Sequence, residues 1–236
     1  MLGKKEQGVD YYKYYTEIIK SGNRGKWASE ITPINERLSS RQINLANKDI
    51  LDISGEPGFF GEDVKKVANR VVVTAFAEEV AFAIKDVLAL ESAKYDFNSD
   101  KLSSLFEPQS FDIIFVRYAI GFCENIELFF DECYKITKEP GFLYVSYSPA
   151  SRGVCARWMF DDYTYLRQYT KKYIVDMAKN AGFNLVCEYD DGSYSWNYNM
   201  HPVQKLISSF YTSKIFKGAS PEEYKQYNVA FLFKKS

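Results

Sequence analysis

The chain has 236 residues, of which 46% are hydrophobic and 26% are charged, a balance that excludes a disordered, collagen-like or coiled-coil protein. With 30 basic and 31 acidic residues its formal net charge is −1, so no overall positive field favours nucleic acid or an anionic membrane as a partner. The length suits one α/β domain with insertions.

The first 48 residues are polar and include four tyrosines within residues 11–15, without the pattern of a buried strand. They predict one or two amphipathic helices, a helical extension over 1–48 that precedes a main domain over 49–236. The N-terminus lacks the apolar run of a signal peptide, and we find no stretch of about 20 apolar residues that could span a membrane. We therefore expect a cytoplasmic protein.

From residue 49 onward, short apolar runs alternate with helical patterns. The runs typical of buried strands are 49–54, 69–76, 92–97, 110–118, 142–148, 181–190 and 227–235. Helical patterns end near residue 68 and cover 78–90, 124–138 and 171–180. Strands that alternate with helices need crossover connections, so the sequence predicts a doubly wound parallel sheet in the α/β class.

Two segments do not fit this alternation, residues 148–169 and 190–227. Both follow the ends of predicted strands, where doubly wound sheets form their ligand sites. We interpret them as insertions that form a lid.

No metal site is expected. The cysteines Cys123, Cys133, Cys155 and Cys187 are widely spaced and form no C-x-x-C motif, and His201 is the single histidine. We expect the cysteines to be reduced and structural.

The most informative segment is ILDISGEPGFFG, residues 50–61. A buried strand reaches Asp52 and then enters a tight turn with Gly55 and Gly58 before a helix. Such a turn allows backbone amides to approach a ligand, and a helix N-terminus favours an anionic group. The glycines alone are equally consistent with an ordinary strand-to-helix connection.

This segment resembles motif I of the class I S-adenosylmethionine-dependent methyltransferases, hydrophobic-hydrophobic-Asp-x-Gly-x-Gly-x-Gly. The matching positions are Ile50, Leu51, Asp52, Ser54, Glu56 and Gly58. The fourth, fifth and sixth strands of that family resemble three further segments of this chain, which are SFDIIFVRYAI, ITKEPGFLYVSYSP and AGFNLVCEYD. The resemblance covers residues 49–189 and 228–235. It implies a Rossmann-like, mostly parallel seven-stranded sheet with an antiparallel last strand, and S-adenosyl-L-methionine as the cofactor.

Three positions depart from the family pattern. Ser54 and Glu56 replace the first two motif glycines. Ala75 stands where the family usually ends its second strand in an acid that binds the cofactor ribose. Glu56, or Glu78 and Glu79, could supply a substitute carboxylate, although the last two more simply favour a helix N-terminus.

The resemblance implies a cofactor site around the turn and the ends of the second, third and fourth strands. Asp96 stands where the family offers an acid to the adenine amino group, with Phe97 beside the ring, and Arg117 and Tyr118 stand between cofactor and acceptor. The residues expected to bind the cofactor are Asp52, Ser54, Gly55, Glu56, Gly58, Phe76, Asp96, Phe97, Arg117 and Tyr118.

Aromatic and basic residues cluster outside the predicted sheet and suit a polar, ring-shaped acceptor such as a sugar. The residues expected to bind it are Tyr11, Tyr14, Tyr15, Arg157, Trp158, Tyr163, Arg167 and Trp196. The candidate catalytic residues are His201, Tyr163 and Arg117, with His201 as a possible general base. Residues 157–170 are equally consistent with a solvated amphipathic connection, and a lone histidine in a tyrosine-rich loop is also consistent with a structural role.

We expect S-adenosylmethionine-dependent methyl transfer to an oxygen or nitrogen of a small polar acceptor, a sugar or another secondary metabolite. The alternative is a methyltransferase-like binding or scaffolding subunit without turnover, motivated by Ser54, Glu56 and Ala75. The sequence contains no nucleophile motif of a hydrolase, and the spacing of its glycines does not match that of a dinucleotide-binding oxidoreductase. The sequence leaves the choice between monomer and homodimer open.

Overall fold

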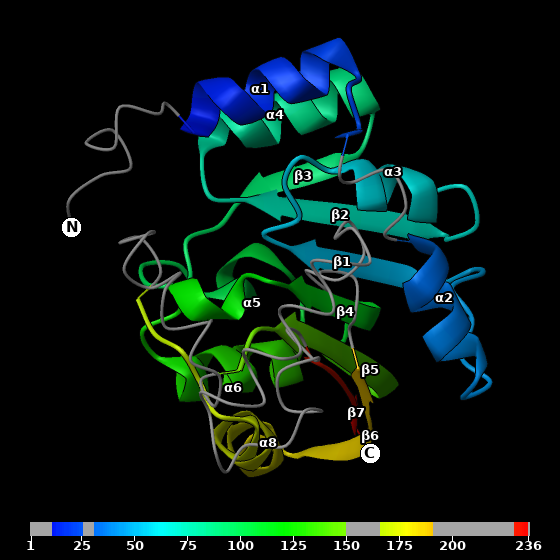
Figure 1. The fold of residues 1–236 in the computed structure, drawn as a ribbon, viewed down its shortest axis with the longest axis vertical. Coiled ribbons are helices and arrows are strands. Elements are labelled where there is room, and N and C mark those ends of the chain that lie inside the picture. The colour runs from blue at the N-terminus through cyan, green and yellow to red at the C-terminus, as the bar shows by residue number, and fades with distance from the viewer. Residues whose placement is uncertain (1–10, 26–30, 150–165, 191–228, 236) are drawn as a thin grey trace, which may run out of the picture.

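A seven-stranded sheet runs through the centre of the molecule, with helices on both of its faces (Figure 1). The computed structural model describes residues 11–25, 31–149, 166–190 and 229–235. The strand order is β3-β2-β1-β4-β5-β7-β6. The strands β1 to β5 pair in parallel, whereas β7 runs antiparallel to both β5 and β6. This is the predicted Rossmann-like fold class, which is confirmed.

The bounds of the elements follow the predicted order. The strands are β1 (Asp49–Ile53), β2 (Arg70–Ala75), β3 (Glu91–Lys94), β4 (Phe111–Arg117), β5 (Thr137–Tyr147), β6 (Phe183–Asp190) and β7 (Val229–Lys235). The helices are α1 (Tyr11–Ser21), α2 (Ile31–Ser39), α3 (Phe59–Val64), α4 (Glu78–Leu88), α5 (Leu102–Leu105), α6 (Ile126–Ile136) and α8 (Lys171–Asn180), with a short 3-10 helix η3 (Ile120–Phe122).

Two strands differ in length from their prediction. The strand β5 begins at Thr137 rather than at residue 142, because the segment through Pro140 and Gly141 stays extended and Thr137 pairs with Phe111. A side chain at Gly141 would lie 2.5 Å from the Lys138 carbonyl oxygen, so this stretch requires glycine. The strand β3 ends at Lys94, which leaves the following residues outside the sheet.

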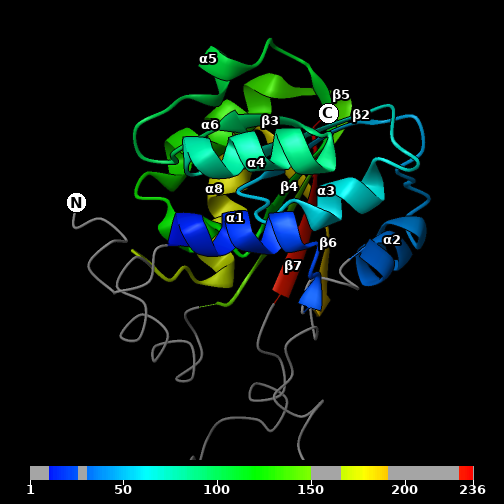
Figure 2. The same ribbon diagram turned by 90° about the horizontal axis from the view of Figure 1, so that it is seen from above.

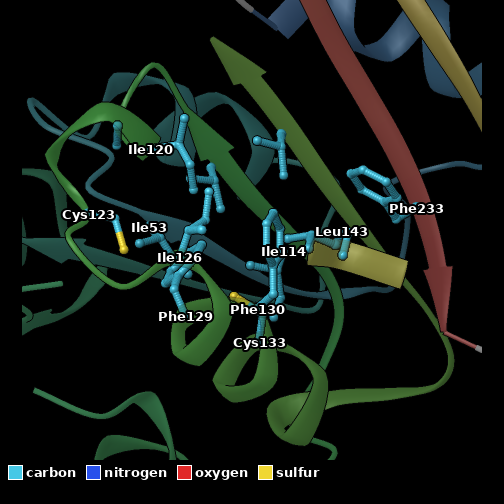
Figure 3. Close-up of a cluster of buried hydrophobic side chains, with 14 of the residues drawn as sticks. Ile53, Ile114, Ile120, Cys123, Ile126, Phe129, Phe130, Cys133, Leu143 and Phe233 are labelled. Carbon is cyan, nitrogen blue, oxygen red and sulfur yellow. The ribbon is translucent and has the colours of Figure 1, made fainter. Parts of the chain in front are cut away.

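The sheet separates two hydrophobic cores. The helices α1 to α4 pack on one face, and α5, α6 and α8 pack on the other. In the second core, shown in Figure 3, Phe130 and Cys133 of α6 lie against Ile114, Leu143 and Phe233 of three neighbouring strands. Because both faces are covered, the central strands are mostly apolar, and the buried Asp52 of β1 is an exception.

The N-terminal helices are part of the first core. Figures 1 and 2 both show α1 alongside α4, and Ile19 of α1 is fully buried. Arg24, just after α1, pairs with Glu62 and with Asp63 of α3, at 2.7 Å from Asp63. The predicted helices before residue 49 are thus anchored on the α3 and α4 side of the sheet.

No helix within the described ranges is long and apolar enough to cross a membrane.

Candidate functional site

The carboxyl ends of β1, β2, β3 and β4 lie at one edge of the sheet, because these neighbouring strands are parallel. The chain reverses its strand order between β1 and β4, which is where such sheets bind ligands. The structure therefore brings together the residues that follow these four strands.

The turn after β1 is fastened to the end of β2. Ser54, whose φ is 50°, donates its backbone N–H to Thr74 Oγ1 at 3.0 Å. The next amide, of Gly55, donates to the Thr74 carbonyl oxygen at 3.1 Å. Gly58 N–H donates to the Gly55 carbonyl oxygen at 2.8 Å and closes the turn.

The two glycines of this turn are required for different reasons. A Cβ at Gly55 would lie 2.2 Å from Asp52 Oδ2, so the turn has room only for glycine above that carboxylate. Gly58 has a φ of 91°, and a Cβ there would lie 3.0 Å from Leu88 Cδ1, near Ile84 of α4. Its side-chain position faces α4, whereas the sequence suggested that glycine was needed for a ligand.

Asp52 and Arg117 bind each other. Arg117 Nη2 lies 2.8 Å from Asp52 Oδ2, and Nε lies 3.1 Å from Oδ1. The Arg117 and Asp52 side chains are 8% and 0% exposed, and the guanidinium also lies 4.1 Å from the centre of the Phe60 ring. A buried charge must be paired, and the two-point geometry satisfies both groups. We had expected both residues to contact ligands.

Glu56 and Phe76 meet at the end of β2. The Phe76 N–H donates to Glu56 Oε1 at 2.8 Å, and both residues are half-buried. The Phe76 ring stacks on Tyr12 of α1, with centroids 6.3 Å apart and planes 14° apart. Tyr12 was not among the residues singled out for the acceptor.

Asp96 lies in the turn just beyond β3, where it is half-buried. Its Oδ1 accepts from the Asn98 N–H at 3.0 Å, and its own N–H donates to Asp100 Oδ2 at 2.8 Å. Phe97 contacts the rings of Tyr95 and Phe129, with centroids 5.4 and 5.1 Å away. Asp96 is therefore at the expected edge, while Phe97 also packs against the core.

At the end of β4, Tyr118 has a φ of 57° and donates its N–H to the Ser146 carbonyl oxygen at 2.8 Å. The exposed residues Leu166 and Arg167 donate their N–H groups to the Gly121 carbonyl oxygen, at 2.9 and 3.1 Å. Arg167 thus lies beside the chain that leaves β4. Tyr169 is buried instead of lining a lid, and its hydroxyl donates to the Cys123 carbonyl oxygen.

The expected N-terminal tyrosines differ in their surroundings. Tyr14 is 43% exposed, whereas Tyr15 is half-buried and packs against the first core. The two rings meet edge to face at 5.5 Å. Tyr11 begins α1.

Several expected residues lie outside the described ranges, so the structure gives no account of them. They are Arg157, Trp158, Tyr163, Trp196 and His201, and Cys155 with them. Of the cysteines that are described, Cys123, Cys133 and Cys187 are free and buried. The described part of the chain contains no group of three potential metal ligands among its His, Cys, Asp and Glu residues.

Two comparisons with solved structures find this fold. An S-adenosylmethionine-dependent methyltransferase from Mesorhizobium loti is 11% identical, with a TM-score of 0.63 over 89% of this chain and 100% of the other. One from Archaeoglobus fulgidus is 14% identical, with a TM-score of 0.60 over 96% of this chain and 100% of the other. A search of curated protein sequences finds no match. A family model described as a methyltransferase domain matches residues 51–145.

The sheet order is that of a Rossmann-like fold, and its first five strands lie in the segment that matches the methyltransferase domain. The match spans β1 to β5, the strands whose ends form the site. Residues 51–145 thus match a methyltransferase domain, and the two solved structures of this fold are described as S-adenosylmethionine-dependent methyltransferases, so S-adenosylmethionine is the cofactor to test against this site.

The groups at this edge suit that cofactor. The Glu56 and Asp96 carboxylates are half-buried acceptors for hydroxyl and amino donors, and Phe76 offers an aromatic face. Asp52 is fully buried and paired, so this carboxylate supports the turn from below. When bound, the cofactor supplies a methyl group on a sulfonium, and the sulfur leaves as a neutral thioether when the methyl group is transferred.

Proposed function

We propose that this enzyme transfers a methyl group to an oxygen or nitrogen of a small polar acceptor, such as a sugar or another secondary metabolite. The observation that carries this proposal is the position of Arg167 beside the chain leaving β4, fixed by its backbone bond to Gly121 at 3.1 Å. Arg167 is exposed, and Tyr118 follows the end of β4 a few residues before Gly121. A guanidinium and a phenol are groups that orient a polar molecule.

Charge also supports a small acceptor. The net charge of −1 gives no general attraction to nucleic acid. In addition, α1 brings Tyr12 to the end of β2, where its ring stacks on Phe76. We therefore propose that residues 1–48 and the insertions 148–169 and 190–227 together enclose the acceptor.

The chemistry asks little of the protein beyond position. Because the donor contains its leaving group, the residues around it need to hold the acceptor in line and exclude water. A general base is optional, and His201 and Tyr163 are our proposed candidates for it. Asp96 and Phe76 are the residues that we propose for the adenine.

The test is a transfer assay with methyl-labelled S-adenosylmethionine and a panel of sugars and small alcohols and amines. We expect label in at least one small product, with formation of S-adenosylhomocysteine. Label that enters only protein or RNA from a cell extract would contradict the small acceptor. Cofactor binding by calorimetry without transfer to any acceptor would favour the binding or scaffolding alternative.

A further inference from the structure

The loop after β4 is bound by a segment that comes much later in the chain. The Gly121 carbonyl oxygen accepts from the N–H groups of Leu166 and Arg167, at 2.9 and 3.1 Å. Two residues further on, the Cys123 carbonyl oxygen accepts from the Tyr169 hydroxyl at 2.7 Å. The position of residues 166–169 therefore depends on the position of this loop.

The turn after β3 binds the same loop through one side chain. Asn98 Nδ2 donates to the Phe122 carbonyl oxygen at 3.0 Å, and Asn98 Oδ1 accepts from the Glu124 N–H at 2.8 Å. These partners lie 24 and 26 residues away in the sequence. Asn98 is half-buried, which limits competition by water for both bonds.

Asn98 is also fastened to Asp96 in its own turn. The Asn98 N–H donates to Asp96 Oδ1 at 3.0 Å, and the Asp96 N–H donates to Asp100 Oδ2 at 2.8 Å. Between them, the Phe97 ring packs against Phe129 of α6, with centroids 5.1 Å apart. A movement of the Asp96 carboxylate therefore also displaces the backbone of Asn98.

An asparagine suits this bridge for a chemical reason. Its amide offers a donor and an acceptor in one planar group, so it binds a carbonyl and an N–H of the loop after β4 together. An ionised aspartate would offer no donor to the Phe122 oxygen and would add a charge close to Asp96 and Asp100.

These contacts form one connected network. It runs from Asp96 through Asn98 to residues 121–124, and from that loop to the segment that carries Arg167. Every step is a direct hydrogen bond or a peptide link. A contiguous network of this kind can carry energetic coupling between two sites.

We propose that Asn98 is a positioning residue that couples the cofactor side of the site to the acceptor side. A ligand that binds Asp96 favours one arrangement of the turn after β3, and Asn98 passes this preference through the loop after β4 to Arg167. The inference rests on the proposed function, from which it takes the roles of Asp96 and Arg167. Because such coupling is reciprocal, each ligand should bind more tightly when the other is present.

The test is hydrogen–deuterium exchange with S-adenosylhomocysteine as the ligand. In the native protein the ligand should slow amide exchange in residues 95–100 and also, by about fivefold or more, in residues 121–124 and 166–169. In Asn98→Ala the slowing should persist in residues 95–100 but fall below about twofold in the other two segments, because the bridge is absent.

Asn69→Ala is the matched control. This asparagine also joins two elements, since Nδ2 donates to Asp49 Oδ1 at 2.6 Å, but it lies at the amino ends of β1 and β2. Its response to the ligand should equal that of the native protein.

A purely structural role for Asn98 would give a different pattern. Residues 121–124 of Asn98→Ala would then exchange faster with and without the ligand, while the ligand-dependent slowing would remain. That result would overturn the proposal, and so would a native protein in which the ligand slows exchange only in residues 95–100.

The proposed function fails by a separate result. Ligand-dependent slowing that is lost in Asn98→Ala, together with no methyl transfer to any small acceptor, would uphold the coupling and refute the acceptor. A native protein that binds no S-adenosylhomocysteine in calorimetry would overturn both.

Discussion

Arg117 at the end of β4 donates two hydrogen bonds to the Asp52 carboxylate in β1, from Nη2 to Oδ2 at 2.8 Å and from Nε to Oδ1 at 3.1 Å. This carboxylate lies directly beneath Gly55 of the glycine turn. The Asp52 carboxylate supports the turn from below, and its Oδ2 is the atom that a side chain at Gly55 would strike. The conformation of the turn thus depends on a buried ion pair.

Breaking this pair should destabilise the protein strongly. Arg117→Leu leaves the Asp52 charge buried without its partner, and we expect the free energy of unfolding to fall by about 3 to 5 kcal/mol. Urea denaturation measures this loss. The double variant with Asp52→Leu should recover much of it, because both charges are then absent. The control is Lys13→Ala, which breaks the exposed ion pair with Glu17. If Arg117→Leu lowered the free energy of unfolding no more than Lys13→Ala does, the burial of the Asp52–Arg117 pair would be contradicted.

Gly58 should be intolerant of a side chain for reasons of packing. Gly58→Ala puts a methyl group 3.0 Å from Leu88 at a positive φ, so it should lower the melting temperature more than Gly22→Ala. Gly22 is the matched control, since its φ is 65° and nothing lies within 4 Å of its Cβ position. Equal shifts in both variants would mean that backbone strain alone matters at Gly58.

The stack of Tyr12 on Phe76 should hold the start of α1 near the cofactor. Removing the ring in Tyr12→Ala should make the free energy of docking of α1 on the domain less favourable by about 0.5 to 1.5 kcal/mol. We expect faster trypsin cleavage within residues 11–25 and a several-fold lower affinity for S-adenosylhomocysteine. Tyr14→Ala, at a ring that is 43% exposed, should leave both nearly unchanged. The same response in the two variants would argue against a specific role for Tyr12.

A charge cluster at the opposite edge of the sheet should make stability depend on acid pH. Burial raises the pKa of Asp112, but bonds from Lys138, the Asp49 amide and Lys48 outweigh it and hold the pKa below the ordinary 3.8. Because the folded pKa is below the unfolded one, the contribution to stability is complete above pH 3.8 and disappears as the pH falls through the folded pKa.

Urea denaturation between pH 5 and pH 2 should therefore show a smaller acid-induced loss of stability in Asp112→Asn than in the native protein, over a range of about 3 pH units. Glu107→Gln is the control, because this exposed side chain lies outside the cluster. Parallel curves for native protein and Asp112→Asn would contradict the role of Asp112.

Strand positions were predictable because buried parallel strands are nearly continuous apolar runs, as in Ile113–Val116, or in Ile50–Ile53 with Asp52 as its one polar residue. The early start of β5 was not, since Pro140-Gly141 is normally a turn signal. The turn after β1 was predictable because Gly55 and Gly58 follow a buried strand and precede a helix. The partner of Asp52 was not identified, although two opposite charges within neighbouring apolar strands are a usable sign of a buried pair.

The contact of Tyr12 with Phe76 had no local signal in the sequence. It depends on how α1 packs along α4, and aromatic residues at helical spacing do not specify which neighbour each ring meets. The same holds for Glu56, since only the folded turn brings its carboxylate to the Phe76 amide.

Phe76 touches two parts of the protein in different ways. Its amide donates to Glu56, and its ring stacks on Tyr12. A ligand that favours one position of Phe76 therefore also favours one seating of α1, and this coupling must act equally in both directions. A change that stabilises the docking of α1 will therefore raise the ligand affinity, and a change that displaces α1 will lower it.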